Sequence, residues 1–284
     1  MRIGYQGEPG AFSEAASRRV DPDAQLVPFR TFEEVFDAVN GGAASYGVLP
    51  IENSIGGSIH RNYDLLLSHE LPIVGEVELP VVHHLLALPG ATLDGLKRVY
   101  SHPQGLAQCE RFLRTLKGVE VIATYDTAGS AKMVADSGAR DAAAIASARA
   151  GEVFGLTPLA SSVQDYDDNI TRFIVIGRRP LKNTVADKTT IVFTVANEPG
   201  ALFKALSVFA LRGVDLTKLE SRPIPGRPWE YRFYVDLAVA RDEVTGTRAL
   251  AHLAEFAPML RTLGTYASWK THEGRMPDPF EVVS

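Results

Sequence analysis

Short apolar runs and amphipathic stretches follow one another through the first 180 residues of the chain. The apolar runs have the length of buried strands, and the amphipathic stretches repeat apolar residues every three or four positions, as helices do. This order is typical of an α/β fold. Strands are expected at 2–6, 26–29, 46–49, 72–88 (in two runs), 98–101, 119–123, 142–146 and 173–176. Helices are expected at 11–20, 31–40, 59–67, 106–113 and 127–136, with a short one capped by Ser147. Thr31 and Glu34 form a plausible capping box, and Asp126-Thr127 is an N-terminal signal for the helix that follows.

The chain crosses twice between two groups of these elements, which predicts a two-lobed clamshell. Lobe 1 is expected at about 1–77 and 164–180, and lobe 2 at about 78–163, so that 1–180 forms one domain. In open α/β sheets, ligands bind at the carboxyl ends of the strands. The loops expected there are Gly7–Phe12, Asn53-Ser54, Ser101–Gln104, Asp126-Thr127, Ser147 and Asn169–Arg172. A clamshell alone serves a binding protein as often as an enzyme.

The pattern changes after residue 180. Residues 181–187 are polar and lack an apolar period, so they are expected to form a linker. Residues 188–271 then predict a ferredoxin-like βαββαβ domain. Its strands are expected at 189–195, 215–220, 229–239 and 262–266, with a turn at Pro223–Pro228. A domain this small commonly pairs its sheet edge with a second copy. Residues 272–284 are left as a tail.

Composition excludes several classes of protein. The formal net charge is −5 and no basic run occurs, which argues against nucleic acid as a partner. The single cysteine, Cys109, cannot form a disulfide within the chain, and the seven histidines lack metal-ligand spacing. No apolar run is long enough to cross a membrane. The chain begins a strand at once without a signal peptide, so we expect a reduced, cytoplasmic compartment.

Cofactor motifs are not found in the sequence. Gly4, Gly7 and Gly10 follow the first strand at a spacing of three, which differs from the dinucleotide-binding fingerprint. No metal and no cofactor are therefore expected.

The stretch Asn169–Phe173 is a candidate for the chemistry of the chain. It offers an amide, a hydroxyl and a guanidinium, and it then runs into the apolar strand 173–176. Thr171 and Arg172 are neighbours in a strand, so their side chains should point to opposite faces. Taken by itself, this stretch fits an ordinary strand start as well as a site.

Five motifs and a C-terminal pair resemble one family. They are Gln6–Ser13, Leu49–Ser54 with Gly56-Gly57, Ser101–Gln104 with Gln108-Cys109, Asp126–Ser130 and Asn169–Phe173, followed by Gly200–Leu202 and Glu220–Pro223. Together they resemble monofunctional prephenate dehydratase with a C-terminal ACT regulatory domain. Each motif is weak alone, but the full set in this order is specific.

The resemblance implies the conversion of prephenate to phenylpyruvate with loss of CO₂ and water. It implies that Thr171 is the hydroxyl nearest the departing group, and that Asn53 and Gln104 orient the substrate. Arg172 would suit a substrate carboxylate, since a guanidinium binds carboxylates in a bidentate fashion. Ser13, Ser54 and Ser101 are expected at helix starts, where they could bind the other carboxylate.

The same resemblance implies feedback inhibition by L-phenylalanine between paired ACT domains. The expected effector site comprises Asn197, Gly200, Ala201, Leu202, Glu220 and Ser221. A homodimer or homotetramer is expected. Two other functions stay open: arogenate dehydratase, which performs the same chemistry on the transaminated substrate, and a non-enzymatic clamshell that senses amino acids.

Structural roles compete with several of these assignments. Ser13 and Ser54 could simply cap helices. Glu52 could act as a general acid, although a structural carboxylate is favoured, and His102 could be a base or a turn residue. Cys109 and the pair His83-His84 lie in apolar surroundings and are interpreted as structural.

Overall fold

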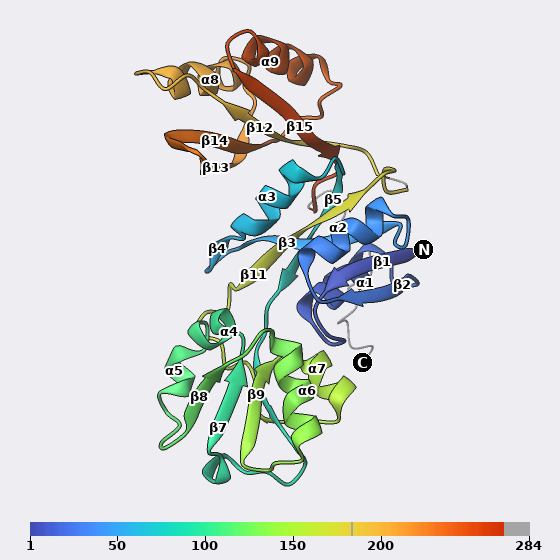
Figure 1. Ribbon diagram of the computed structural model, residues 1–284, viewed down its shortest axis with the longest axis vertical. Coiled ribbons are helices and arrows are strands. Elements are labelled where there is room, and N and C mark those ends of the chain that lie inside the picture. The colour runs from blue at the N-terminus through green and yellow to red at the C-terminus, as the bar shows by residue number, and fades with distance from the viewer. Residues whose placement is uncertain (183, 270–284) are drawn as a thin grey trace. The chain divides into compact units, whose positions relative to one another are not determined.

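The computed structural model describes residues 1–182 and 184–269 (Figure 1). The chain divides into two compact units. The first comprises Met1–His69 and Val77–Ile174, and the second comprises Glu70–Glu76 and the described residues from Val175 onward. The predicted tail, 272–284, lies outside the described residues. The predicted boundaries of the lobes, linker and regulatory domain stay predictions.

Lobe 1 of the first unit is built on a sheet with strand order β2-β1-β3-β11-β5. β1 pairs in parallel with both β2 and β3, as expected for strands joined through helices. Its strands are β1 (Arg2–Gln6), β2 (Gln25–Phe29), β3 (Tyr46–Asn53), β4 (Gly57–Ser58, paired with β3), β5 (Ile73–Pro80) and β11 (Ile170–Gly177). Its helices are α1 (Phe12–Val20), α2 (Phe32–Asn40) and α3 (His60–Ser68).

Lobe 2 contains a second sheet with strand order β10-β6-β9-β7-β8. Its strands are β6 (His84–Ala87), β7 (Arg98–Ser101), β8 (Glu120–Ala123), β9 (Ala142–Ala146) and β10 (Thr157–Ala160). Its helices are α4 (Pro103–Ala107), α5 (Glu110–Leu113), α6 (Thr127–Ser137) and α7 (Ala148–Phe154), with a 3₁₀ turn at Leu93–Gly95.

The alanine-rich strand β9 lies at the centre of lobe 2 and is buried on both faces. Ala142, Ala144 and Ala146 pack with residues of α6 and α7. Ala143 and Ile145 point the other way and pack with Cys109. Small side chains let helices approach both faces of the sheet closely. The interpretation of Cys109 as a core residue is confirmed, and burial raises the pKa of its thiol to about 12.

Three predicted helix starts are confirmed. Thr31 Oγ1 accepts from Glu34 N, Asp126 Oδ1 accepts from Gly129 N, and Ser147 Oγ accepts from Ala150 N. One predicted helix is wrong in part, because 106–113 is broken into α4 and α5. The chain leaves helical geometry at Cys109, with φ −120° and ψ 22°, so Gln108 becomes the C-terminal capping residue of α4.

Within the first unit the two lobes touch at a glycine. A Cβ on Gly10 would lie 2.6 Å from Ala150 Cα, and the φ of Gly10 is +91°, so a larger residue does not fit. Ser147 Oγ donates to the Gly10 carbonyl at 2.6 Å. Glu8 bonds to Tyr125 OH and Lys132 Nζ, each at 3.3 Å. These contacts hold the loop before α1 against lobe 2.

The second unit contains the predicted βαββαβ arrangement. Its elements are β12 (Lys188–Thr194), α8 (Ala201–Ala210), β13 (Leu216–Ile224), β14 (Arg227–Leu237), α9 (Val244–Ala254) and β15 (Met259–Tyr266). The sheet order is β13-β14-β12-β15. Ile73, at the start of β5, belongs to this second unit and pairs in parallel with Gly264 of β15. The predicted turn at Pro223–Pro228 is too long, because β13 runs to Ile224 and only Pro225-Gly226 separates it from β14.

Candidate active site

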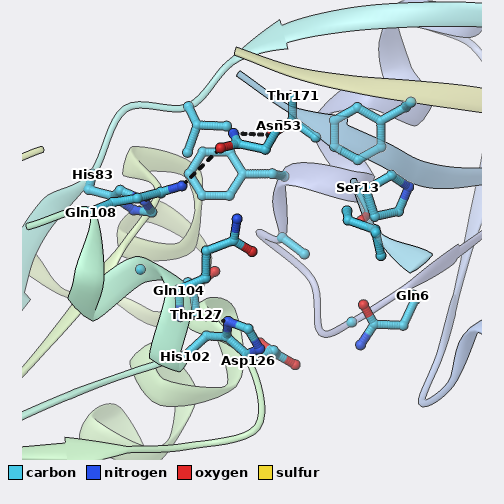
Figure 2. A pocket seen from close by; sticks show the side chains of 18 of the residues that line it. Gln6, Ser13, Asn53, His83, His102, Gln104, Gln108, Asp126, Thr127 and Thr171 are labelled. Carbon is cyan, nitrogen blue, oxygen red and sulfur yellow. Dashed lines mark hydrogen bonds between the residues drawn. The ribbon is translucent and has the colours of Figure 1, made fainter. Parts of the chain in front are cut away.

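A cavity of about 340 Å³ opens between the two lobes of the first unit. Its size falls within the range of small-molecule sites. Lobe 1 and the ends of β3 and β11 contribute Gln6, Gly7, Ala11, Phe12, Ser13, Phe32, Pro50, Asn53, Ile59, Thr171 and Phe173. Lobe 2 and the segment entering it contribute Val81, His83, His102, Gln104, Gly105, Gln108, Tyr125, Asp126 and Thr127. Figure 2 shows these side chains converging from the two sides.

Asn53 is the centre of a buried hydrogen-bond network in the wall of this cavity. Its Oδ1 accepts from the backbone N–H groups of Ile55 and Gly56, at 3.1 and 2.7 Å. Its Nδ2 donates to the backbone carbonyl of Ile170 at 3.2 Å. Backbone N–H groups only donate and carbonyls only accept, so the backbone fixes the orientation of the Asn53 amide.

This orientation decides where the proton of the Thr171 hydroxyl points. Asn53 Nδ2 donates to Thr171 Oγ1 at 3.0 Å, so the oxygen acts as the acceptor in that bond. Thr171 is 8% exposed and lines the cavity. No acceptor for its own proton is found among the described residues. The Thr171 O–H is therefore available to a molecule in the cavity.

Gln108 extends the network and was not selected as a site residue from the sequence. Its Nε2 donates to Asn53 Oδ1 at 3.2 Å, and its Oε1 accepts from Asn169 Nδ2 at 3.0 Å. Gln108 lies four residues after Gln104, at the helix break described above. That spacing on a helix would place both amides on one face, and it is the signal that could have identified Gln108.

His83 completes the network at 2.9 Å from Gln108 Oε1. Because that oxygen can only accept, Nε2 of His83 carries the proton. Burial lowers the pKa of His83, and the hydrogen bond that His83 donates to Gln108 opposes the shift. The imidazole is thus a neutral ring that holds Gln108, and Phe12 packs edge-on against it with ring centroids 5.4 Å apart. The structural interpretation of His83 fits this placement.

Several donors face the cavity without a partner in the described part of the chain. The side-chain amide of Gln104 and the hydroxyl of Thr127 are among them. Gln104 packs so closely on Gly56 that a Cβ there would lie 1.9 Å from its Nε2. The first N–H groups of α1, at Phe12 and Ser13, also lack acceptors, and no side chain caps this helix. Helix N-termini of this kind attract anions.

Three predicted substrate-binding residues do not line the cavity. Arg172 pairs with Glu52, with 3.2 Å between Nη2 and Oε2, on the opposite side of β11 from Thr171. The predicted alternation is confirmed, and Glu52 has a structural ion pair. Ser101 Oγ is buried and donates to the Ile145 carbonyl.

The expected helix starts are wrong for Ser54 and Ser101, whereas Ser13 does lie in the first turn of a helix. Ser101 ends β7, and His102 is the residue that caps α4, with its Nδ1 accepting from Gln104 N. Ser54 is followed by β4 rather than by a helix, and its Oγ bridges Asp168 O and Ile170 N. Ser13 is the second residue of α1 and caps nothing, but it does line the cavity.

Asp126 carries the one carboxyl group among the described residues that line the cavity. Burial raises its pKa above the ordinary value of 3.8, and a hydrogen bond from the Gly129 N–H opposes this shift. The nearby Glu8 charge raises the pKa further, and His102 lowers it. Burial lowers the pKa of His102 itself.

Among the described residues, no cluster of side chains could hold a metal ion, and no helix is long and apolar enough to cross a bilayer.

The predicted effector residues lie on two elements of the second unit. Gly200, with φ +81°, precedes α8 and leaves the helix start without a side-chain cap. Ala201 and Leu202 begin the helix, and Asn197 is exposed in the loop before it. Glu220 is half-buried and Ser221 exposed on β13, an edge strand of the sheet as described.

A two-lobed α/β domain with a donor-lined cavity, joined to a ferredoxin-like domain, defines a class of proteins that bind small molecules. A family model for prephenate dehydratase matches residues 3–181, and one for the ACT domain matches residues 189–254. The chain belongs to the prephenate dehydratase family, whose members are hydro-lyases, and carries a C-terminal ACT domain.

Relatives and solved structures agree with this assignment. Arogenate dehydratase/prephenate dehydratase 6, a chloroplastic protein of Arabidopsis thaliana, is 49% identical over 94% of this chain and 68% of its own length. The prephenate dehydratase of Arthrobacter aurescens, solved in complex with L-Phe, is 32% identical with a TM-score of 0.87 over 95% of this chain and 91% of that one. GqqA, described as a novel type of quorum quenching acylase, is 37% identical with a TM-score of 0.85 over 94% and 98%. The two-lobed, periplasmic-binding-protein-like fold with an ACT domain is thus established.

Proposed function

We propose that this protein is a prephenate dehydratase in which the Thr171 hydroxyl assists the departing group. The observation that carries the proposal is the direction of that hydroxyl. Backbone groups fix Asn53, Asn53 donates to Thr171 Oγ1, and the Thr171 proton is left for the cavity. A preorganised donor of this kind is worth about 10²–10³ in rate.

The reaction needs little else from the protein. The ring carboxylate of prephenate leaves as CO₂, and the electron pair of the broken C–C bond moves into the ring. The C–O bond to the ring hydroxyl breaks, the hydroxyl takes up one proton, and it leaves as water. The products are phenylpyruvate, CO₂ and water. Threonine is a weak acid, so Thr171 donates a hydrogen bond or relays a proton rather than supplying one outright.

The substrate carboxylates require donors, and the cavity offers uncharged ones. We assign one carboxylate to the free N–H groups at the start of α1, beside the predicted residue Ser13. Gln104 would orient the substrate from lobe 2, in agreement with its predicted role. Asn53 acts through Thr171, because its donors are already used. Arg172 and Ser54 would act from behind the wall by holding the strands that carry Asn53 and Thr171. Ser101 would act in lobe 2, where it bonds β7 to β9 just before the segment that carries Gln104.

The test is a rate measurement with purified protein. Phenylpyruvate is followed by its ultraviolet absorbance after addition of prephenate, with and without L-phenylalanine. We expect turnover that L-phenylalanine reduces. Prephenate that persists unchanged would contradict the proposal and favour a clamshell without enzymatic activity.

We propose that L-phenylalanine binds at the ACT domain and inhibits the enzyme. A related dehydratase was solved with L-Phe, which supports this ligand. The uncapped start of α8 at Gly200 offers N–H groups to a carboxylate, and Glu220 offers a carboxylate to an ammonium group. Asn197, Ala201, Leu202 and Ser221 would complete the site.

Pairing of ACT domains would place these two elements against a second copy. Several large apolar side chains of this domain are exposed: Phe203, Leu211, Leu219, Trp229 and Tyr231. Their exposure supports the predicted homodimer or homotetramer, because pairing with a second copy would bury them. Light scattering with and without L-phenylalanine measures the oligomeric state.

The predicted cytoplasmic location also stays a proposal, since chloroplastic relatives are known, and cell fractionation tests it.

Two alternatives differ in their support. Arogenate dehydratase activity is favoured by relatives such as arogenate dehydratase 1 of Petunia hybrida, which is 49% identical over 94% of this chain. Acylase activity has less support, because neither cavity histidine bonds to a serine among the described residues. His83 is bonded to Gln108, and His102 caps α4. Parallel assays with prephenate and arogenate separate the first alternative.

A further inference from the structure

The charge of the cavity does not match a substrate that carries only negative charge. Among the described residues that line it, Asp126 is the sole carboxylate, and none is a lysine or an arginine. A carboxylate that faces a bound dianion weakens binding, because like charges repel strongly where water is excluded. A substrate that carries a positive group as well would account for the Asp126 carboxylate in this cavity.

The two oxygens of Asp126 have different environments. Oδ1 caps α6 by accepting from Gly129 N. Oδ2 is shielded from solvent and has no hydrogen-bond partner among the described residues. An acceptor without a donor, out of water, is costly, and a ligand that supplies a donor relieves the cost. Figure 2 shows the Asp126 side chain reaching from α6 toward the opposite lobe, where Gln6 lies.

Gly7 of lobe 1 connects this oxygen to the anion-binding end of α1. A Cβ on Gly7 would lie 3.9 Å from Asp126 Oδ2 and 3.1 Å from the Cβ of Ala11, the residue that precedes α1. The free carboxylate oxygen and the uncapped helix start thus face the same short loop. An α-amino acid carries its carboxylate and its ammonium group one carbon apart, with charges complementary to these two features.

We infer that Asp126 selects the amino-acid form of the substrate, by binding the ammonium group that arogenate carries where prephenate has a keto oxygen. This inference rests on the proposed dehydratase function. The side-chain carboxylate of the substrate lies at the start of α1, and its ammonium group donates to Asp126 Oδ2, which a small rotation of the Asp126 side chain brings to the cavity. Prephenate offers only acceptors at this position, so Asp126 makes it the poorer of two substrates that the site turns over.

The test compares kcat/KM for the two substrates in Asp126→Asn. Asparagine caps a helix as well as aspartate does, so the variant removes the charge and keeps the cap. We expect kcat/KM to fall for arogenate and to rise for prephenate, so that their ratio falls about 10- to 100-fold. Asp126→Ser, which also caps, should shift the ratio in the same direction. Asp94→Asn, an exposed site away from the cavity, is the matched control and should leave the ratio unchanged.

The outcomes are distinguishable. A ratio in Asp126→Asn and Asp126→Ser that stays within twofold of the unsubstituted protein, with intact thermal transitions, would overturn the role of Asp126. So would the failure of arogenate to react while prephenate is turned over. Turnover of neither substrate by the unsubstituted protein would overturn the dehydratase function itself and this inference with it.

Discussion

Thr171→Val removes the hydroxyl of Thr171 and keeps the shape of its side chain. Thr171 lies in β11 at the cavity wall, and its oxygen accepts from Asn53 Nδ2 at 3.0 Å. If the remaining proton assists the departing group, kcat should fall about 10²–10³-fold, the value of one preorganised donor. KM should change little, because the lost interaction forms mainly in the transition state.

The network shows why stability should survive this change. The two hydrogens of Asn53 Nδ2 serve three acceptors: Thr171 Oγ1, Asn169 Oδ1 at 2.7 Å and Ile170 O at 3.2 Å. With valine at position 171, two acceptors remain for two hydrogens, so no buried donor is left without a partner. The free energy of unfolding should therefore change by no more than about 1 kcal/mol, the net value of one hydrogen bond.

Thr171→Ser is the matched variant. It keeps the hydroxyl and loses one methyl group, which is worth about 0.8 kcal/mol, so kcat should fall less than about tenfold. Initial rates of phenylpyruvate formation and urea denaturation measure the two quantities. Near-normal kcat in Thr171→Val would refute the role of the hydroxyl, and an equal collapse in Thr171→Ser would show that the methyl packing matters more than the oxygen.

Three further predictions concern other parts of the chain. Ser221→Ala should leave kcat intact and raise the L-phenylalanine concentration for half-inhibition about tenfold or more, as expected for a coupling of about 1–3 kcal/mol between the sites. Joint loss of activity and inhibition would argue against a separate effector site. The arogenate-to-prephenate ratio of kcat/KM should fall as the pH drops through the raised pKa of Asp126, above 3.8, because the neutral acid no longer attracts ammonium. Asp126→Asn, which leaves the neighbouring Glu8, His102 and Tyr125 in place, is the control, and its ratio should not follow this pH dependence. Lys188→Met should lower the free energy of unfolding by about 3–5 kcal/mol, since it removes the cation that pairs with the buried Glu76, whose Oε2 lies 2.8 Å from Lys188 Nζ. Lys204→Met at an exposed pair should cost less than about 1 kcal/mol by urea denaturation.

Strand alternation and helix capping predicted the structure well where a single strand or helix determines the position of a side chain. Strand alternation correctly separated Thr171 from Arg172, and side-chain capping correctly placed Asp126 and Ser147 at helix starts. The same rules were wrong for Ser54 and Ser101, because a short hairpin and a strand end occupy the positions where helices were expected.

Contacts between lobes could not be predicted in this way. Gln108 reaches Asn53 across 55 residues of sequence, and Asn169 reaches Gln108 across 61. The break between α4 and α5 turns Gln108 inward. It falls at Gln108 and Cys109, and neither residue is a glycine or proline that would predict it. The free oxygen of Asp126 depends likewise on the approach of Gly7 from the other lobe. Family resemblance identified Asn53 and Gln104 as site residues. The structure identified Gln108, whose side-chain amide bonds to Asn53.

We propose that this cavity eliminates CO₂ and water from prephenate together. The most direct measurement follows both carbon products at once, with CO₂ in the headspace and phenylpyruvate by ultraviolet absorbance, in the presence of the purified protein. We predict that they form in equal amounts, at a rate that Thr171→Val lowers about 10²–10³-fold. Release of neither product above the buffer control would contradict the account, as would an equal rate in Thr171→Val.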